Sequence, residues 1–233
     1  MKLAGLSAVL FDKDGTLFDF SASWSDYTMG ILNDLSQGDE GRAHAMATSL
    51  QFDRHARQFR PSSPVIAGTV DVAASLLAPH LPHMQHGAIV AYLKDTSADI
   101  QMVPPVELLP LLNALLHSGL ALGVATNDGE RPARDHLARA GVLHLFGHVL
   151  GYDSGFTPKP DPAMLRGYAA LAGVAPETVV MVGDSTHDLV AGRAAGMATI
   201  GVLTGLARED DLAPFADIIV PHIGHLPDVL ELG

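Results

Sequence analysis

The sequence predicts an α/β protein in which a parallel sheet carries helices on both faces and an all-helical segment is inserted into the chain. Beyond residue 102, short apolar runs alternate with segments of helical spacing, which is typical of parallel strands joined by helices. Another apolar run, at 6–10, is separated from these by residues 18–101, which have helical spacing and no strand alternation. The chain of 233 residues, 48% of them hydrophobic, is long enough for a large core.

The first expected strand, Leu6–Leu10, is apolar throughout, as in a central strand that is covered on both faces. It is followed by two carboxylates one residue apart, Asp12 and Asp14, and Gly15 then lets the chain turn. A buried strand that delivers acids at its carboxyl end is a common way to build a site in an open α/β sheet.

The inserted segment is expected to hold four helices, because its apolar residues recur near helical spacing and prolines follow the second and third helices. The helices are expected over 25–35, 39–59, 69–77 and 86–100. Arg54, Arg57 and Arg60 lie three residues apart. This spacing predicts that the three arginines form a solvated face of a helix. The alternative is that one of them binds an anionic part of a substrate.

Strands and helices alternate in the rest of the chain, and glycines follow several of the helices, as is common at helix C-termini. The strands are expected over 120–125, 146–152, 178–182, 199–202 and 217–220. The helices are expected over 106–118, 131–140, 162–172, 186–195 and 223–232. The chain therefore divides into a discontinuous α/β core, residues 1–17 and 102–233, and an insert, residues 18–101.

The charge of the chain argues against several classes of partner. Its 14 basic and 26 acidic residues give a net charge of −12, which disfavours nucleic acid and anionic membranes as partners. It has no cysteine, and no apolar stretch approaches the ~18 residues of a membrane span. The first residues do not form a signal peptide, because acids interrupt the apolar run. A cytoplasmic protein is expected.

Four polar clusters follow the expected strands or lie in the loops that join them. They are Asp12 with Asp14, Thr126 with Asn127, Lys159, and Asp184 with Asp188. Because the carboxyl ends of parallel strands share one edge of a sheet, we expect these clusters to converge there. Each also has an ordinary interpretation, since Asp-Gly favours turns and Asp often caps helices.

The carboxylates at this edge predict a magnesium site. Asp12, Asp14 and Asp184 would repel one another unless a cation neutralised them. Mg²⁺ suits a site with a few carboxylates, several waters and a substrate phosphate. A zinc site is disfavoured, because the chain has no cysteine and only His187 adjoins the acidic loops.

The remaining polar residues suit a phosphoryl group. Lys159 would serve phosphate as a point charge, and the Thr126 hydroxyl with nearby backbone N–H groups would hold other oxygens. An Asp can act as the nucleophile and form an aspartyl-phosphate. A second acid can protonate the leaving oxygen and later activate water.

Other side chains have less specific interpretations. Three regularly spaced histidines suggest a metal, but prolines interrupt any helix there, so surface positions are expected for His80, His83 and His86. His187 is expected to be exposed on the first turn of its helix, and the alternative is a position near the site. Phe20 and Trp24 are expected either to pack the insert against the core or to line a substrate pocket.

Four motifs resemble those of the haloacid dehalogenase-like hydrolase superfamily and occur in its order. They are Phe11-Asp12-Lys13-Asp14-Gly15-Thr16-Leu17, Ala125-Thr126-Asn127, Lys159-Pro160-Asp161-Pro162 and Val182-Gly183-Asp184-Ser185-Thr186-His187-Asp188. The resemblance implies a Rossmann-like core. It also implies that the insert is a helical cap, which closes over the site and selects the substrate.

The resemblance further implies roles for the acidic residues. Asp12 would be the nucleophile and a Mg²⁺ ligand. Asp14 would be the general acid/base and would bind Mg²⁺ through its backbone carbonyl. Asp184 would ligate Mg²⁺, and Asp188 would support the metal site.

The same resemblance assigns the phosphoryl group to Thr126 and Asn127, with Lys159 neutralising it and holding Asp12. The layout is most similar to the phosphoglycolate phosphatase group, although Phe20 stands where that group often has Ser. The expected function is Mg²⁺-dependent hydrolysis of a small phosphorylated metabolite. The alternatives are a sugar-phosphate mutase of the same superfamily and a binding protein that retains the fold without catalysis.

Overall fold

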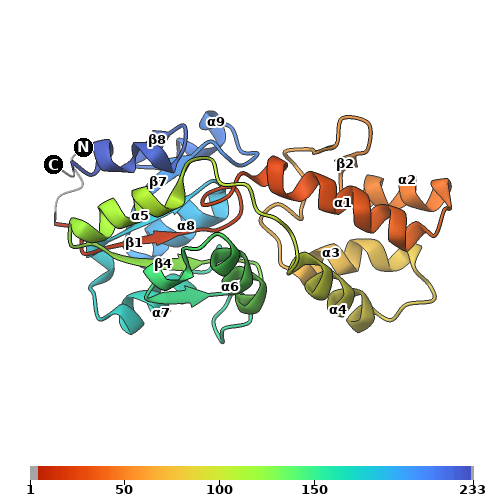
Figure 1. The fold of residues 1–233 in the computed structure, drawn as a ribbon, viewed down its shortest axis with the longest axis horizontal. Coiled ribbons are helices and arrows are strands. Elements are labelled where there is room, and N and C mark those ends of the chain that lie inside the picture. The colour runs from red at the N-terminus through yellow and green to blue at the C-terminus, as the bar shows by residue number, and fades with distance from the viewer. Residues whose placement is uncertain (1–4, 232–233) are drawn as a thin grey trace.

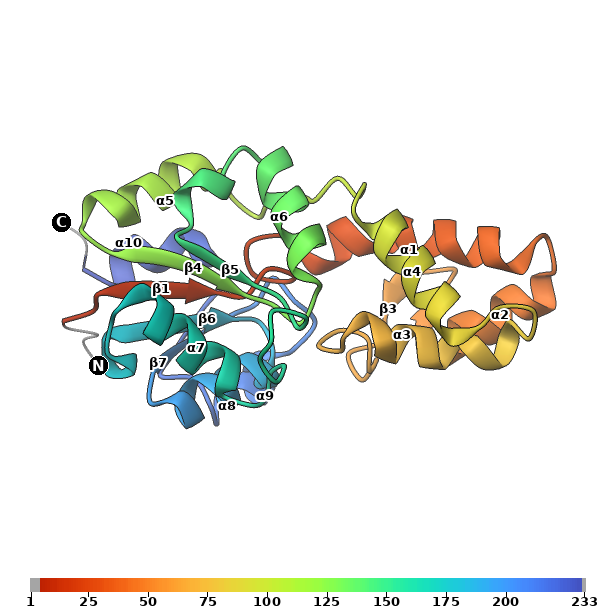
Figure 2. The ribbon, with the colours of Figure 1, turned by 90° about the horizontal axis from the view of Figure 1, so that it is seen from below.

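The computed structural model describes residues 5–231 and consists of two bodies that lie end to end (Figures 1 and 2). The larger body is a six-stranded parallel sheet with helices on both faces. The smaller body is formed mainly by helices of the inserted segment, and the arrowhead of β1 points toward it (Figure 1). The expected fold class, a Rossmann-like α/β core with a helical insert, is confirmed. Residues 1–4, with which the expectation about a signal peptide begins, lie outside the described part.

The sheet has the strand order β5-β4-β1-β6-β7-β8, and all neighbouring strands run parallel. The strands are β1 (Ala8–Phe11), β4 (Ala121–Ala125), β5 (His148–Leu150), β6 (Val179–Gly183), β7 (Ala198–Val202) and β8 (Ile218–Val220). All four residues of β1 pair with both β4 and β6. Asp12, which follows β1, therefore leaves the middle of the sheet, between the loops that follow β4 and β6.

Alternate residues of β1 contact different helices, as expected for side chains that point to opposite faces of a strand. Val9 and Phe11 belong to a buried cluster with residues of α5, α6 and α10, whereas Ala8 and Leu10 belong to another with residues of α7 and α8. These helices are α5 (Leu108–His117), α6 (Glu130–Arg139), α7 (Ala163–Ala172), α8 (Thr186–Ala195) and α10 (Leu226–Val229). The sheet is thus covered on both faces, which explains the apolar run of β1.

The inserted body has a core of its own. Its helices are α1 (Phe20–Ser36), α2 (Glu40–Ser49), α3 (Val70–Leu77) and α4 (His86–Ser97). Leu32, Met46, Leu77 and Ile89, one from each helix, are fully buried in one apolar cluster. Asp19 caps the first helix by accepting a hydrogen bond from the Ala22 backbone N–H at 2.8 Å.

The expected helix over 39–59 is wrong, and so is the expectation that the insert is entirely helical. Helix α2 ends at Ser49, and a short antiparallel pair follows, formed by β2 (Phe52–Asp53) and β3 (Gln58–Phe59). Gln51 adopts φ 53°, a left-handed conformation that ends the helix. Phe52 and Phe59 are seven residues apart, which suits two turns of helix. They also pair across the hairpin and share one buried face, so the apolar spacing alone could not separate the two structures.

The other expected elements are found with small shifts at their ends. The expected last helix, over 223–232, is a 3₁₀ turn at Ile223–His225 followed by the short α10, and its end at Leu232 lies outside the described residues. A short helix, α9 (Glu209–Leu212), was not expected. Within residues 5–231, no helix has the length and apolar character to cross a membrane.

Candidate active site

The four predicted polar clusters lie beyond the carboxyl ends of the strands, where the core faces the inserted body. Asp12 follows β1, Thr126 follows β4 and Asp184 follows β6, whereas Lys159 lies in the loop between β5 and α7. All four line one cavity. Residues far apart in the sequence therefore meet, as the shared edge of a parallel sheet predicts.

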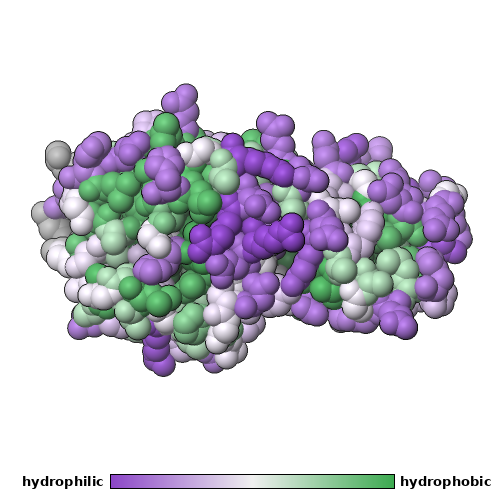
Figure 3. Space-filling view, turned by 60° about the horizontal axis from the view of Figure 1, so that its bottom comes forward, coloured by the Kyte–Doolittle hydropathy of each residue, from purple (hydrophilic) through white to green (hydrophobic). Residues whose placement is uncertain are grey.

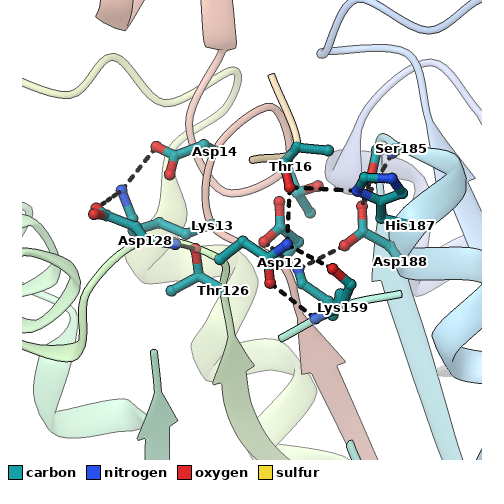
Figure 4. Close-up of polar contacts among 12 residues, drawn as sticks. Asp12, Lys13, Asp14, Thr16, Thr126, Asp128, Lys159, Ser185, His187 and Asp188 are labelled. Atoms are coloured by element: carbon teal, nitrogen blue, oxygen red, sulfur yellow. Dashed lines mark hydrogen bonds and ion pairs between the residues drawn. The ribbon is translucent and has the colours of Figure 1, made fainter. Parts of the chain in front are cut away.

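Lys159 joins two of the predicted acids (Figure 4). Its Nζ lies 2.6 Å from Oδ1 of Asp12 and 2.6 Å from Oδ1 of Asp188. All three residues are buried. Charge-assisted hydrogen bonds in such a setting are strong, so Asp12 is held in one orientation by a cation.

Asp188 has a second task at the N-terminus of α8. Its Oδ2 accepts hydrogen bonds from the Ser185 backbone N–H at 3.0 Å and from the Ser185 hydroxyl at 2.6 Å. Asp188 is therefore both the capping-box residue of the helix and a partner of Lys159. The interpretation of Asp188 as a helix cap is confirmed, and the same carboxylate also contacts Lys159.

Asp184 is packed so closely that two neighbouring residues have to be glycine. A Cβ atom on Gly15 would lie 2.3 Å from Asp184 Oδ2, and one on Gly205 would lie 1.7 Å from the same oxygen. The Thr16 hydroxyl donates to Asp184 Oδ1 at 3.3 Å. The backbone thus leaves space for this carboxylate beside Asp12.

Burial dominates the electrostatics of the acids. It raises the pKa of Asp12 to about 7, although Lys159 acts in the opposite direction. Burial, followed by repulsion from Asp188 and Asp12, raises the pKa of Asp184 well above its ordinary value. Burial lowers the pKa of Lys159, but Asp12 and Asp188 more than offset this, so its pKa is raised. Three carboxylates with one ammonium group leave an excess of negative charge.

Three carboxylates are arranged to share a cation. Asp12, Asp184 and Asp188 each offer an oxygen, and these oxygens lie within 4.8 Å of one another. The donors are hard oxygens, and burial together with mutual repulsion raises the pKa of Asp12 and Asp184, so a bound cation would favour their ionised forms. This donor set fits Mg²⁺. The side chain of Asp14, expected from the sequence to join these acids, is not part of the set.

The Asp14 carboxylate points away from Asp12 (Figure 4). Its Oδ1 lies 2.7 Å from Nζ of Lys13 and accepts a 2.9 Å hydrogen bond from the indole Nε1 of Trp24. Lys13 is fully buried and also lies 3.1 Å from Asp128 Oδ2 and 3.1 Å from Nδ1 of His136. Asp14 nevertheless still lines the cavity.

Lys13 is surrounded by Asp14, Asp128 and His136, and the last two were not predicted from the sequence. Burial lowers the pKa of Lys13, but attraction to Asp14 and Asp128 more than offsets this effect, so the pKa is raised. Burial, followed by repulsion from Lys13, lowers the pKa of His136. The available signal was the position of Asp128, two residues after Thr126 in the loop that follows β4.

Thr126 and Asn127 connect the loops. The Thr126 hydroxyl accepts a hydrogen bond from the Asp128 backbone N–H at 3.0 Å. The Asn127 amide donates to the carbonyls of Lys159 and Ala67, both at 2.8 Å, and its Oδ1 accepts from the Lys159 backbone N–H at 3.0 Å. Asn127 therefore fixes the Lys159 loop and contacts the insert through Ala67.

Phe20 and Trp24 both line the cavity, and Phe20 is also part of the buried core of the insert. Packing and pocket lining are thus combined in these aromatic residues. His187 was expected to be exposed, but it is half-buried, because its Nδ1 lies 3.3 Å from the Ala67 carbonyl and its ring faces the cavity.

The remaining predicted positions lie away from the active-site cavity. Arg54 pairs with Glu40, and Arg57 pairs with Asp26. Serine hydroxyls contact two of the spaced histidines: Ser49 lies 2.8 Å from His80, and Ser75 lies 3.2 Å from His86.

Comparison with known proteins decides the family. The family model described as "Haloacid dehalogenase-like hydrolase" matches residues 9–202. The chain belongs to this family. The phosphoglycolate phosphatase of Rhodospirillum rubrum is 34% identical over 206 residues, covering 87% of this chain and 81% of that protein. The N-acetylmuramic acid 6-phosphate phosphatase of Pseudomonas aeruginosa is 30% identical over 236 residues, covering 99% and 97%.

A solved structure supports the same fold for this haloacid dehalogenase-like hydrolase. CbbY from Rhodobacter sphaeroides, in complex with phosphate, superposes with a TM-score of 0.70 at 20% identity and covers 97% of this chain and 99% of that one. The resemblance inferred from the four motifs is thereby confirmed, including the phosphoglycolate phosphatase-like group. The chain is accordingly a phosphoric monoester hydrolase of this family.

Proposed function

We propose that this hydrolase is a Mg²⁺-dependent phosphatase that cleaves a small phosphorylated metabolite through an aspartyl-phosphate on Asp12. The arrangement of Asp12 carries the proposal: it follows the central strand, faces the cavity, and is held by Lys159 at 2.6 Å. A carboxylate fixed in this way has one orientation in which to meet a phosphorus atom.

Asp12, Asp184 and Asp188 would hold the Mg²⁺ ion, together with the backbone carbonyl of Asp14 that the family resemblance implies. The bound cation would neutralise charge on the phosphoryl oxygens and keep these carboxylates ionised. Lys159 would then be left as a counter-charge for the phosphoryl group itself.

In the first step, a carboxylate oxygen of Asp12 attacks phosphorus while the bond from phosphorus to the leaving oxygen breaks. Asp14 donates the proton that the leaving oxygen takes up. Thr126 and Lys159 hold the phosphoryl oxygens, and Asn127 keeps the Lys159 loop in place. The carboxylate of Asp14 would turn from Lys13 and Trp24 into the cavity that it already lines.

In the second step, water attacks the phosphorus of the aspartyl-phosphate and gives its proton to Asp14. Inorganic phosphate leaves and Asp12 is regenerated. Residues 18–101 would act as the cap over a core formed by 1–17 and 102–233, excluding bulk water until the first step is complete. We place this chemistry in the cytoplasm, because a cysteine-free chain has no disulfide suited to an oxidising compartment.

The test is release of inorganic phosphate from p-nitrophenyl phosphate by the wild type and by Asp12→Asn, with Mg²⁺ and with EDTA. The wild type with Mg²⁺ is expected to turn over, whereas the variant and the EDTA sample are not. Asp95→Asn, on an exposed position of α4, is the matched control and should retain activity. Full activity of Asp12→Asn would refute the mechanism. A second incubation, with a sugar phosphate as the substrate, tests the mutase alternative. Isomerised sugar phosphate without release of free phosphate would support it.

A further inference from the structure

The cavity above the carboxylates extends into the inserted body. It has a volume of about 140 Å³, and one end is formed by Asp12, Thr126 and Lys159 of the core. The other end is lined mainly by apolar side chains that come from three of the four cap helices, from β3 and from the loop after β3. They include Phe20, Ile31, Phe59, Ile66, Val70 and Leu77.

Three of the polar side chains at the apolar end are already engaged. The Trp24 indole donates to Asp14, and the Tyr27 hydroxyl donates to the Leu93 carbonyl at 3.1 Å and lies 3.0 Å from the Thr96 hydroxyl. The Ser97 hydroxyl donates to the Lys94 carbonyl at 3.1 Å. These three groups are therefore not free to bind a polar substituent, which leaves the hydroxyls of Thr28 and Thr69 among the uncharged side chains that line this end. Burying a polar substituent without a partner is costly.

The charges around the cavity disfavour a second anion on the substrate. Among its described lining residues, the lysine and arginine side chains are represented by Lys159 alone, whereas five carboxylates line the same space. Lys159 is bound by two of those carboxylates. The nearby arginines Arg54 and Arg57 pair with acids elsewhere and do not line the cavity. On the face shown in Figure 3, hydrophilic residues gather where the two bodies meet, so the apolar character belongs to the interior of the cavity.

The size of the cavity limits the organic part of the substrate. An apolar cavity of about 150 Å³ holds one benzene molecule. The whole cavity, including its core end, has about 140 Å³ and would also hold the phosphoryl group, so the organic part is limited to one small ring or a short alkyl chain.

We propose that the substrate is a phosphate monoester whose organic part is an uncharged, apolar ring or short chain, held between the aromatic and aliphatic residues of the cap. This inference rests on the proposed phosphatase function. Its consequence is that 2-phosphoglycolate, which carries a carboxylate where this cavity offers apolar walls, is a poor substrate. The chain would then differ in substrate from the phosphoglycolate phosphatases that it resembles.

The kinetic test compares kcat/KM for methyl, ethyl, butyl and hexyl phosphate with that for 2-phosphoglycolate. Burial of each added methylene is expected to raise kcat/KM about fourfold until the cavity is full. Ethyl phosphate matches phosphoglycolate in length, and its kcat/KM is expected to be at least about tenfold higher. Equal rates along the alkyl series, or a preference for phosphoglycolate, would overturn the inference.

A variant that fills the apolar end tests its location. Ala73 lines the cavity from α3, and Ala73→Leu is expected to lower the ratio of hexyl to methyl phosphate kcat/KM about tenfold. Ala88→Leu is the matched control, because Ala88 is exposed on α4 and does not line the cavity. An unchanged ratio in Ala73→Leu would contradict the proposed position of the organic group.

A binding experiment separates this inference from the proposed function. Trp24 is the single tryptophan of the chain and lines the cavity, so its fluorescence reports occupancy. Hexylphosphonate, which is not hydrolysed, is expected to bind at least about tenfold more tightly than methylphosphonate in Mg²⁺ buffer. If this preference holds but no monoester is hydrolysed, the phosphatase proposal fails and the apolar pocket stands. Equal binding of the two phosphonates overturns the pocket itself.

Discussion

The indole Nε1 of Trp24 donates a 2.9 Å hydrogen bond to Oδ1 of Asp14. Trp24 belongs to the first helix of the inserted body, and Asp14 belongs to the loop that carries Asp12, the proposed nucleophile. A residue of the inserted body thus holds the second acid on the side of Lys13, away from Asp12. The position of the inserted body and the orientation of this acid are therefore physically linked.

Removing the charge of Lys13 is expected to destabilise the core. Lys13→Met removes the fully buried ammonium group that Asp14 and Asp128 share as their counter-ion. The expected cost is about 3–5 kcal/mol in the free energy of unfolding. Urea unfolding followed by circular dichroism measures this change. Lys94→Met removes a half-exposed pair with Asp153 and should cost less than about 1 kcal/mol. Similar losses in the two variants would contradict the role of Lys13.

Asp188→Asn is expected to weaken Mg²⁺ binding. The change removes one negative charge from the group of three carboxylates and one ionic partner of Lys159, while the amide oxygen can still accept the hydrogen bonds that cap α8. The Mg²⁺ concentration that gives half-maximal activity should rise at least about tenfold. A Mg²⁺ titration of phosphate release measures it, and an unchanged midpoint would show that Asp188 has no part in the metal site.

Gly205→Ala is expected to reduce activity without affecting folding of the core. The added Cβ would lie 1.7 Å from Asp184 Oδ2 and would displace this carboxylate. Misplacement of a group in the site by about 1 Å can cost about 10²-fold in rate. Gly87→Ala is the control, because nothing lies within 4 Å of a Cβ there. Wild-type kcat/KM in Gly205→Ala would contradict the steric argument.

The loss of stability at higher pH should disappear when Mg²⁺ is added. In the metal-free protein the pKa of Asp12 is raised from 3.8 to about 7, so the folded state keeps a proton that the unfolded state loses. The stability contributed by Asp12 is complete below pH 3.8 and is lost as the pH rises through about 7. Mg²⁺ binds the ionised form and should remove this loss.

Melting temperatures at pH 5 and pH 7.5, with EDTA and with Mg²⁺, test this expectation. Asp12→Asn, which cannot ionise, should show a weaker dependence on pH in EDTA. The same profile with EDTA and with Mg²⁺ would show that these carboxylates do not hold the ion.

Most of the core and the position of the site were accessible from the sequence. A strand buried on both faces has to be apolar, so β1, β4 and β6 stand out without any knowledge of their partners. Short alternating helices then require the strands to run parallel, which places Asp12, Thr126 and Asp184 at one edge. The hairpin after α2 could not be predicted, because the spacing of Phe52 and Phe59 suits one face of a helix and a cross-strand pair equally well.

The sequence by itself determined the sheet, the insert and the polar residues that could meet at the edge of the sheet. Only the tertiary structure decided which of these polar residues contact one another. Asp12 lies with Lys159, whereas Asp14 turns to Lys13, because a buried ammonium group requires carboxylate partners. It also decided the apolar lining of the cavity, because Phe20, Phe59 and Leu77 come from separate elements that meet only when the cap folds.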